Sequence, residues 1–287
     1  MVEEGTTNLF PTNLALSFSS AWTSWTLNGT YTVSIKGGTG SLVLSGGASG
    51  TVNVGSSLTF TVSNATVTFT PSGGTPAYCQ LERKPYATSF VDGTRSAETL
   101  TIPTAGVLNP QEGTVEFWWM PINQPASTMT GSQSVAPPII QVGYYYENNS
   151  WILWCGLDSQ LKLLVRGDNA TGWTGQWTII PNLSWYQLNR WYHIVVRWEN
   201  ANTFWVFIDG VKYGPYVSSQ PFTGIAGNIM SLGRLNAVSG PSNALYDDLR
   251  ISSRARTDEE IAAAYASGQP LPVDEWTTYL LRFDDNL

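Results

Sequence analysis

The stretch that decides the fold is Gly113-Thr114-Val115-Glu116-Phe117-Trp118-Trp119-Met120. It is rich in β-branched and aromatic residues, which favour a long β-strand. The chain after it repeats this pattern without an intervening helix. Strand-like runs lie at 151–155, 161–165, 191–198, 204–208, 229–233 and 244–252, and Asp209-Gly210 predicts a tight hairpin turn between 204–208 and Val211-Lys212-Tyr213. So many strands in succession predict a large antiparallel β-sandwich.

The chain before residue 90 has a different composition. Between Gly5 and Leu81 the only charged side chain is Lys36, and Ser, Thr, Gly, Asn and Val dominate. Short runs of alternating residues lie between Gly-rich turns, at 31–35, 51–54, 58–62 and 65–69. This spacing predicts a small antiparallel sandwich with one apolar face and one hydroxyl face. The uncharged face suits packing against a partner chain, and it suits plain exposure equally well.

One helix is expected near the C-terminus. Thr257 is placed to cap it, Glu260 completes a capping box, and Gly268 ends it. Its apolar stripe, formed by Ile261, Ala264 and Tyr265, must pack on the sandwich because a helix of about ten residues is marginal alone. The polar, Pro-rich segment 122–138 predicts a long surface loop.

Composition limits the function classes. The 287 residues carry 12% charged side chains, about half the usual share, and 13% aromatic side chains, with a net charge of −7. We therefore expect no nucleic-acid partner and no anionic membrane partner. The N-terminal residues do not resemble a signal peptide, and no apolar run is long enough to span a bilayer. Cys79 and Cys155 are expected to be buried thiols, with a disulfide as the alternative.

The sequence predicts no catalytic residues. His193 is the only histidine, which removes most triads and metal clusters. A retaining glycosidase needs two carboxylates about 5–5.5 Å apart, and no strand carries acids at alternating positions. Glu116 stands alone on its strand. Asp247 and Asp248 are adjacent, so they should point to opposite faces of a strand. Pairing of acids across strands is the alternative that stays open.

Ligand binding is expected at aromatic loops. Sugars present C–H faces to aromatic rings, while their hydroxyls require polar neighbours such as Asn. The segments 144–151 and 168–177 have this mixture, and we predict Tyr145, Asn148, Asn149 and Trp173 as ligand-binding residues. The other rings of these segments should point into the core: Tyr144, Tyr146, Trp151 and Trp177. Packing also accounts for the tryptophans within strands: Trp118, Trp119, Trp154, Trp191, Trp198 and Trp205.

Two stretches resemble known families. The run 80–95, QLERKPYATSFVDGTR, resembles a junction in phage tail and prophage structural proteins, where it closes a carbohydrate-binding-module-like sandwich. The segments 113–119, 191–198, 204–210 and 247–257 resemble, in order and spacing, the laminin G-like, concanavalin A-like jelly roll. The resemblance implies an all-β protein with a small sandwich at 1–89, a jelly roll at 90–271 and a terminal strand at 272–287. That strand either completes the sheet or opens a further module.

The resemblance also implies a function. We expect a non-enzymatic phage tail fibre or tail-tip component that binds a host-surface glycan, acts with other virion tail proteins and forms a homo-oligomer, such as a trimer. A purely structural spacer and a polysaccharide-cleaving enzyme are the alternatives. Lectin-like sandwiches often bind calcium, which here implies Asp247 with the Asp92-Gly93 loop. Otherwise Asp247 caps a turn or pairs with Arg250 or Arg95. The expected location is the virion.

Overall fold

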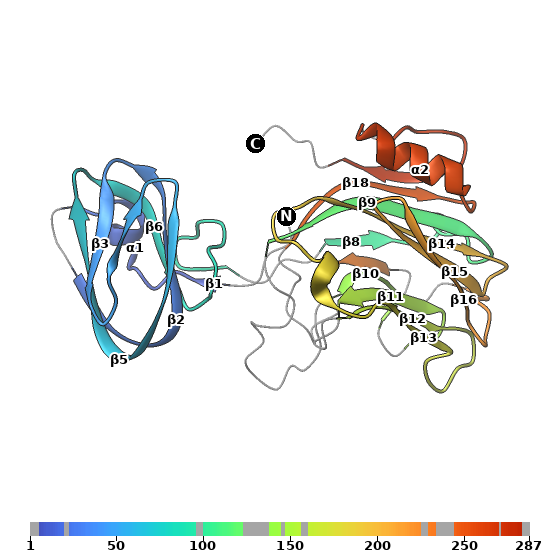
Figure 1. The fold of residues 1–287 in the computed structure, drawn as a ribbon, viewed down its shortest axis with the longest axis horizontal. Coiled ribbons are helices and arrows are strands. Elements are labelled where there is room, and N and C mark those ends of the chain that lie inside the picture. The colour runs from blue at the N-terminus through green and yellow to red at the C-terminus, as the bar shows by residue number, and fades with distance from the viewer. Residues whose placement is uncertain are drawn as a thin grey trace. The chain divides into compact units, whose positions relative to one another are not determined.

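The computed structural model in Figure 1 divides the chain into two compact units near residue 97. It describes residues 6–19, 23–95, 100–122, 138–144, 147–155, 160–224, 229–233, 244–269 and 271–282. Most of the predicted loop at 122–138 and the predicted binding residue Tyr145 lie outside these ranges. Each unit has a hydrophobic core of its own. The all-β prediction is confirmed.

The smaller unit contains a five-stranded antiparallel sheet in the order β4-β3-β5-β2-β6, counted over its described residues. Phe10, Phe18 and Phe69 are fully buried in its core, where Phe10 meets the other two rings edge-on. The elements are β1 (Thr6–Thr7), α1 (Thr12–Leu16), β2 (Thr23–Gly38), β3 (Ser41–Gly46), β4 (Gly50–Asn53), β5 (Ser57–Ser72), β6 (Pro76–Glu82) and β7 (Thr94–Arg95), which pairs with β1.

Two strands of this sheet are longer than the sequence pattern indicates. The predicted runs 58–62 and 65–69 belong to the single strand β5, which pairs along most of its length with β2. Asn64 lies between the two runs with φ 47°, opposite a register shift near Leu27, so the chain forms a bulge here and not a turn. The hydroxyl face is ordered by cross-strand pairs, including Ser24 with Thr68 at 2.7 Å and Thr30 with Thr61 at 3.0 Å.

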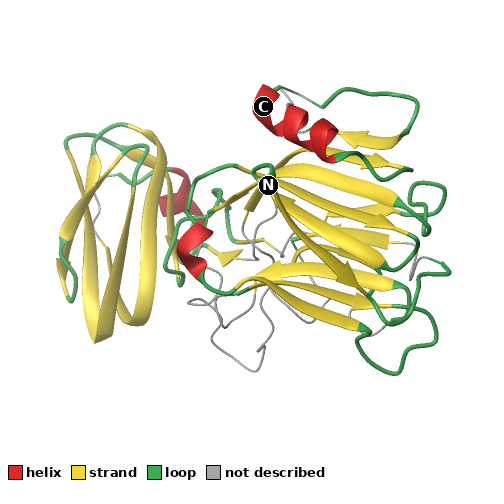
Figure 2. Cartoon of the chain, turned by 45° about the vertical axis from the view of Figure 1, so that its right-hand side comes forward, coloured by secondary structure: helices red, strands yellow, loops and turns green. Residues whose placement is uncertain are grey.

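The larger unit is a sandwich of two antiparallel sheets, each with six described strands (Figure 2). The first has the order β16-β15-β14-β9-β18-β19 and the second β13-β12-β11-β10-β17-β8. The strands are β8 (Leu100–Pro103), β9 (Gly113–Pro121), β10 (Pro138–Val142), β11 (Ser150–Cys155), β12 (Leu161–Arg166), β13 (Gly175–Ile180), β14 (Tyr192–Glu199), β15 (Thr203–Ile208), β16 (Val211–Val217), β17 (Ile229–Leu232), β18 (Ala244–Ser252) and β19 (Thr277–Leu281). A short 3₁₀ helix spans Leu183–Trp185. The terminal strand β19 pairs with β18 and so extends the first sheet.

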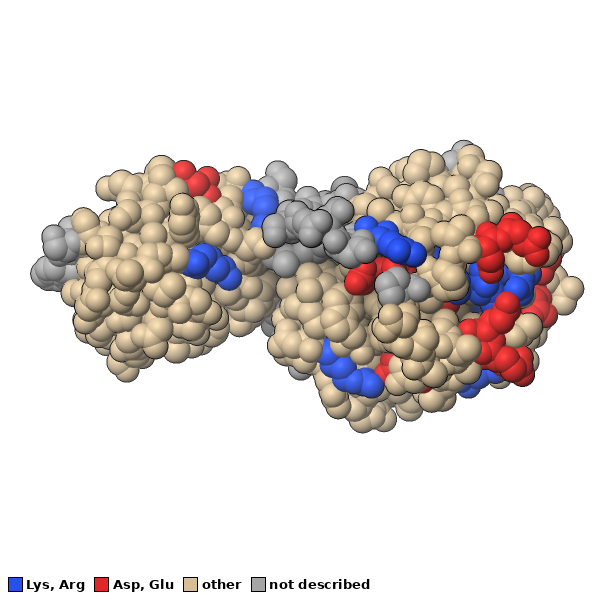
Figure 3. Space-filling model, turned by 90° about the horizontal axis from the view of Figure 1, so that it is seen from above, with Lys and Arg blue, Asp and Glu red and all other residues tan. Residues whose placement is uncertain are grey.

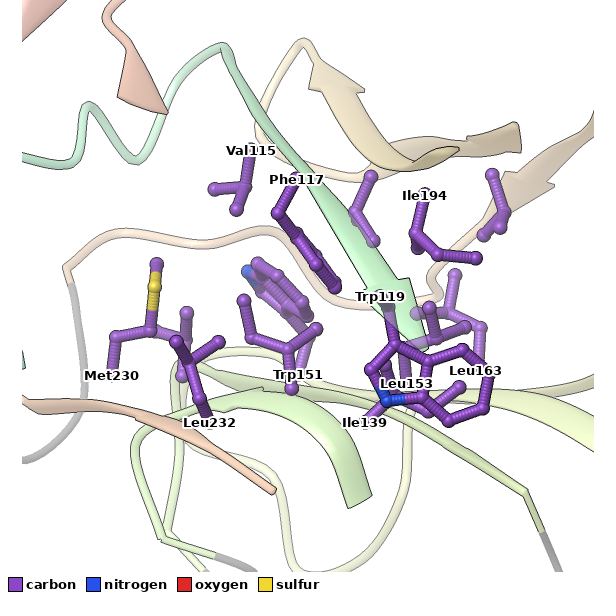
Figure 4. Packing of buried hydrophobic residues seen from close by; sticks show 14 of the residues in the cluster. Val115, Phe117, Trp119, Ile139, Trp151, Leu153, Leu163, Ile194, Met230 and Leu232 are labelled. Carbon is purple, nitrogen blue, oxygen red and sulfur yellow. The ribbon is translucent and has the colours of Figure 1, made fainter. Parts of the chain in front are cut away.

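The core of this unit lies between the two sheets. Figure 4 shows Val115, Phe117 and Trp119 of β9 above side chains of the second sheet, among them Trp151 and Leu153 of β11. Because β9 alternates, the residues between these three, Glu116 and Trp118, lie on the outer face of the first sheet. That outer face carries the polar chemistry described below.

The predicted helix forms as α2 (Asp258–Ser267) on this outer face (Figure 2). Both halves of the Thr257 and Glu260 capping box are present, and Gly268 ends the helix with φ 55°. Ile261 is fully buried against Val195 and Phe207. Burial of one such side chain contributes about 1.5–3 kcal/mol to the stability of the fold, which explains why a short helix is stable here.

The two cysteines are both free and buried, as predicted. Burial raises the pKa of the Cys79 thiol to about 12, so this thiol is protonated and unreactive near neutral pH. No helix within the described residues has the length and apolar character of a membrane span.

Candidate functional site

A row of three side chains crosses the outer face of the first sheet. Trp118 of β9 lies in register with His193 of β14 on one side and with Asp247 of β18 on the other. The Trp118 ring lies 5.1 Å from the His193 ring and 6.2 Å from the Tyr265 ring of α2, measured between centroids. Trp118 is therefore held by the sheet below it and by the helix beside it, with part of its surface exposed.

The next strand position contains a bulge that changes the direction of an acid. Between Asp247 and Arg250, β18 has one residue more than the facing segment of β9, and Asp248 has φ 47°. The Asp248 amide donates a hydrogen bond to the Asp247 carboxylate at 2.8 Å. The prediction that these two acids point to opposite faces is wrong, because strict alternation fails at a bulge. Both residues line the same pocket.

This pocket, which we call the tryptophan pocket, has a volume of about 300 Å³. Its lining comes from four parts of the fold, with Trp191 immediately before β14 and the last two residues just beyond α2: Trp118, Trp191, Asp247, Asp248, Gly268 and Gln269. Trp191 is 38% exposed. The C-terminal end of α2 adds partial negative charge to that of the two carboxylates. The tryptophan pocket thus combines aromatic surface with hydrogen-bond acceptors.

A buried ion cluster lies next to the tryptophan pocket, on the same face of the sheet. Glu116 is fully buried and forms a salt bridge with Arg250, whose Nε donates to Oε1 at 2.6 Å. Arg256 Nε lies 3.5 Å from the same oxygen, and His193 Nε2 lies 3.6 Å from Oε2. Arg256 also contacts Asp274 at 2.8 Å. These contacts tie β9, β14, β18 and the segment after α2 into one rigid support.

Burial alone would raise the pKa of Glu116, because it disfavours the charged carboxylate. The neighbouring His193 and the positive charge of Arg250 outweigh that effect, so the pKa lies below its ordinary value. Glu116 is therefore ionised at neutral pH, and the fully buried carboxylate is held by arginines. Its surroundings are those of a structural ion and not of a group exposed to a substrate.

The residues predicted to bind a ligand lie at the loops beside β11 and β12. Asn148 Oδ1 accepts a hydrogen bond from Arg166 at 3.1 Å, and Asn149 Oδ1 accepts one from the Thr223 amide at 3.1 Å. Trp173 is half-buried against Ile152 and Leu164. The structure brings these two loops together, and the side chains of both asparagines hold them through hydrogen bonds. Of the rings expected in the core, Trp151 is buried, whereas Tyr144 is exposed.

The residues predicted to hold calcium are divided between the two units. Asp247 belongs to β18 of the larger unit, and Asp92 and Gly93 form an exposed turn of the smaller unit, where the Gly93 carbonyl accepts a hydrogen bond from the Asn8 amide at 2.8 Å. Among the described residues, no group of three or more His, Cys, Asp and Glu side chains is arranged around a common point. Backbone carbonyls also bind calcium, so this site stays a prediction.

The sequence pattern predicts packing roles for Trp118 and Trp191, whereas in the structure both line the tryptophan pocket. Trp118 could have been found by alternation, because it lies between the inward residues Phe117 and Trp119. Trp191 precedes its strand, and no periodic signal marks it. The joint position of the two acids depends on the bulge, which the sequence does not reveal.

Comparison with known proteins identifies the larger unit. The family profile of the concanavalin A-like lectin/glucanases superfamily matches residues 92–262. No curated protein sequence matches the chain significantly.

Several solved structures resemble the fold at low sequence identity. The receptor-binding domain of botulinum neurotoxin C/D mosaic serotype is 13% identical, with a TM-score of 0.44 over 60% of this chain and 41% of that one. The enzymatically active domain of tailspike protein 2 from bacteriophage CBA120 is 16% identical, with a TM-score of 0.48 over 65% of this chain and 29% of that one. Domain 4 of an extracellular arabinanase from Geobacillus stearothermophilus is 20% identical, with a TM-score of 0.40 over 55% of this chain and 68% of that one.

The chain thus spans less than half of the neurotoxin and tailspike chains. The family profile, in contrast, covers more than half of this chain and includes β9, β14 and β18, which carry the tryptophan pocket. The chain belongs to the concanavalin A-like lectin/glucanases superfamily.

Proposed function

We propose that this protein is a non-enzymatic component of a phage tail fibre or tail tip that binds a polysaccharide of the host surface. The observation that carries the proposal is the tryptophan pocket, in which an exposed indole and a second, fixed indole stand beside two carboxylates. The superfamily supports carbohydrate binding in general terms. The resemblance of residues 80–95 to phage tail junctions supports the virion as the location.

The chemistry of the tryptophan pocket suits a sugar ring. Trp191 and Trp118 offer flat apolar surface to the C–H face of a pyranose, while the carboxylates of Asp247 and Asp248 accept hydrogen bonds from its hydroxyls. The volume of about 300 Å³ is at the lower end of small-molecule sites, which suits one or two sugar residues of a longer chain. Within the described part of the chain the lining includes two acids and no basic side chain, although Arg282 Nε lies 3.9 Å from Asp248 Oδ1. A neutral glycan therefore fits better than an acidic one.

The surroundings of Glu116 favour binding over cleavage. It is the only acid on β9, and its carboxylate is fully buried under arginine side chains. Asp247 and Asp248 are consecutive residues at one bulge, where the Asp248 amide donates to the Asp247 carboxylate, and not acids on two facing strands. A glycosidase places its two carboxylates on either side of the scissile bond, with room for the sugar between them.

The test is binding of the purified protein to a glycan array and to host cell-wall polysaccharides. We expect retention of a neutral polysaccharide and about a tenfold loss of affinity in Trp191→Ala, since a stacked ring contributes on the order of 1–1.5 kcal/mol. Trp276→Ala is the matched control, because Trp276 is 42% exposed on the same unit and lies outside the tryptophan pocket. Asp247→Asn should weaken binding without altering the fold.

Three results would contradict the proposal. If the assembled protein retains no polysaccharide, the spacer alternative is favoured. If Trp191→Ala and Trp276→Ala bind as tightly as each other, binding occurs elsewhere, and the loops with Asn148, Asn149 and Trp173 become the next site to test. Release of reducing ends from the bound polysaccharide would favour the enzyme alternative.

We also propose a homo-oligomer, such as a trimer, that acts with other tail proteins. Weak individual sugar contacts become effective when several copies act together, with avidity gains on the order of 10²–10⁴. Sedimentation equilibrium of the purified chain measures the number of subunits directly, and a monomer at all concentrations would contradict this part of the proposal.

Calcium at Asp247 is a separate proposal. An ion that binds only the folded protein raises its melting temperature, so chelation should lower the midpoint of the wild type and leave Asp247→Ala unchanged. Differential scanning calorimetry with and without EDTA provides the measurement. An equal midpoint for the wild type under both conditions would exclude a structural ion.

A further inference from the structure

The smaller unit concentrates its positive charge in one place. The charged residues between 6 and 95 are Lys36, Glu82, Arg83, Lys84, Asp92 and Arg95. Three of the four basic residues, Arg83, Lys84 and Arg95, line a single pocket, although the whole chain has a net charge of −7. Much of the visible surface of this unit, on the left in Figure 3, is uncharged. This pocket therefore gathers three of the four cationic side chains of this unit.

This second pocket, which we call the basic pocket, has a volume of about 300 Å³ and lies entirely within the smaller unit. Four of its lining residues belong to the two-stranded ribbon in which Thr6 and Thr7 of β1 pair with Arg95 and Thr94 of β7. Leu9 follows β1, and Arg83 and Lys84 follow β6. The lining consists of Thr6, Thr7, Leu9, Arg83, Lys84, Thr94 and Arg95.

Glu82, the acid next to Arg83 in sequence, is engaged by two threonines, one of which, Thr6, lines the basic pocket. Glu82 is fully buried, and its carboxyl oxygens accept hydrogen bonds from Thr6 Oγ1 at 2.7 Å and from the Thr88 amide at 3.0 Å. Arg83, the next residue, is exposed, and its guanidinium lies beside Gly29, where an added Cβ would be 3.6 Å from Nε. Among the described residues, no hydrogen bond or ion pair engages this guanidinium.

From these contacts we infer that the basic pocket binds the carboxylate of an acidic saccharide. A guanidinium such as that of Arg83 forms short, charge-assisted hydrogen bonds with a carboxylate. The hydroxyls of Thr7 and Thr94, which lie 3.1 Å apart, can bind sugar hydroxyls, and the exposed side chain of Leu9 offers apolar surface to a sugar C–H face. The pocket volume fits one sugar residue with its acidic group.

The inference extends beyond the neutral-glycan site proposed above, since the two pockets belong to different units and have opposite charge. A saccharide acid bound at the smaller unit would give the protein a second, electrostatic contact with a polysaccharide. Its affinity should fall with salt, because the rim is exposed and the Debye length is about 10 Å at 0.1 M ionic strength.

The experiment is isothermal titration calorimetry of the full chain with a galacturonic acid trisaccharide, with the neutral galactose trisaccharide and inorganic phosphate as comparison ligands. We expect the acidic trisaccharide to bind at one site. Arg83→Gln should weaken it about tenfold, the loss typical of one charge-assisted hydrogen bond. Lys36→Gln is the matched control, because Lys36 is the exposed basic residue of this unit outside the pocket.

The variant Trp191→Ala separates the two sites. If it still binds the acidic trisaccharide, the basic pocket acts independently of the tryptophan pocket, whatever the fate of the neutral-glycan proposal. The inference is overturned if the neutral trisaccharide binds Trp191→Ala as tightly as the acidic one does, or if phosphate alone binds as tightly. It is also overturned if Lys36→Gln and Arg83→Gln weaken binding of the acidic trisaccharide by the same factor. Failure of the wild type to bind the acidic trisaccharide at low salt also overturns it.

Discussion

At the scale of single residues, the outer face of the first sheet is organised around one buried acid. Glu116 balances the charges of Arg250 and Arg256, and each arginine extends the cluster to a further segment of the chain. Arg250 donates to the Pro272 carbonyl at 2.7 Å, and Arg256 reaches Asp274. Apolar side chains of equal volume in place of this ion cluster would not hold so many segments of the chain in position at once.

This cluster makes Glu116→Gln a costly substitution. Glutamine has nearly the same shape, but it leaves two buried arginines without their shared counter-charge. We expect a loss of about 3–5 kcal/mol in the free energy of unfolding of the larger unit, measured by urea denaturation. Glu275→Gln, at an exposed acid, should change it by less than about 0.5 kcal/mol. A Glu116→Gln variant as stable as this control would show that the cluster contributes nothing to stability.

At the scale of elements, α2 is attached by acids at its N-terminal end. Asp258 contacts both Arg197 and Lys212 at 2.7 Å, and Glu260 accepts a hydrogen bond from Arg254 at 2.8 Å while it completes the capping box. Arg254, the capping hydrogen bond to Thr257 and the charge of Arg256 lower the pKa of Glu260 to about 2, from an ordinary value of 4.5. The helix therefore depends on its ionised acids.

Acid should loosen this helix. The fold favours the ionised form of Glu260, so its contribution is complete above the ordinary pKa near 4.5 and is lost as the pH falls from there toward 2. The pKa of Asp258 is lowered as well, by Lys212 first and then by Arg197, and it acts in the same direction. We expect the melting temperature of the larger unit to fall across this range, measured by circular dichroism.

The variant Glu260→Gln isolates the contribution of the cap. Its free energy of unfolding at pH 7 should be about 1 kcal/mol below that of the wild type, a modest loss because the pair is partly exposed. On acidification its melting temperature should fall less than that of the wild type. Glu259→Gln, at the exposed neighbour on the same helix, is the control and should keep the pH profile of the wild type. An unchanged profile in Glu260→Gln would contradict the proposed origin of the acid sensitivity.

At the scale of the whole molecule, the chain contains two separate cores with different chemistry. The smaller unit combines an aromatic and aliphatic core with hydroxyl-rich surface strands, and the larger unit combines a tryptophan-rich core with charged networks. Since stability in each unit comes from its own buried residues, the two should unfold independently.

Calorimetry of the full chain should therefore show two transitions. The segment 98–287 expressed alone should fold, with its transition within a few degrees of the corresponding one in the full chain. It should also keep any neutral-glycan binding, because the tryptophan pocket lies wholly within it. A segment that stays unfolded when isolated would show that its core depends on the other unit.

The sequence by itself determined the fold class, the helix and the state of the cysteines. Alternation at 113–120, the capping signals at Thr257, Glu260 and Gly268, and the apolar surroundings of Cys79 are local patterns, and local propensity is read directly from neighbouring residues. The laminin G-like resemblance agrees with the superfamily that matches residues 92–262.

Only the tertiary structure decided which residues meet. The bulge at Asp248 places two consecutive acids in one pocket, and Trp191 joins them from the segment before β14. The pairing of β1 with β7 places Arg95 in the pocket that Arg83 also lines. These arrangements depend on strand register and on backbone irregularities, which arise from contacts between residues far apart in the chain. Periodicity assigns a residue to a face of its strand, and long-range packing determines its neighbours there.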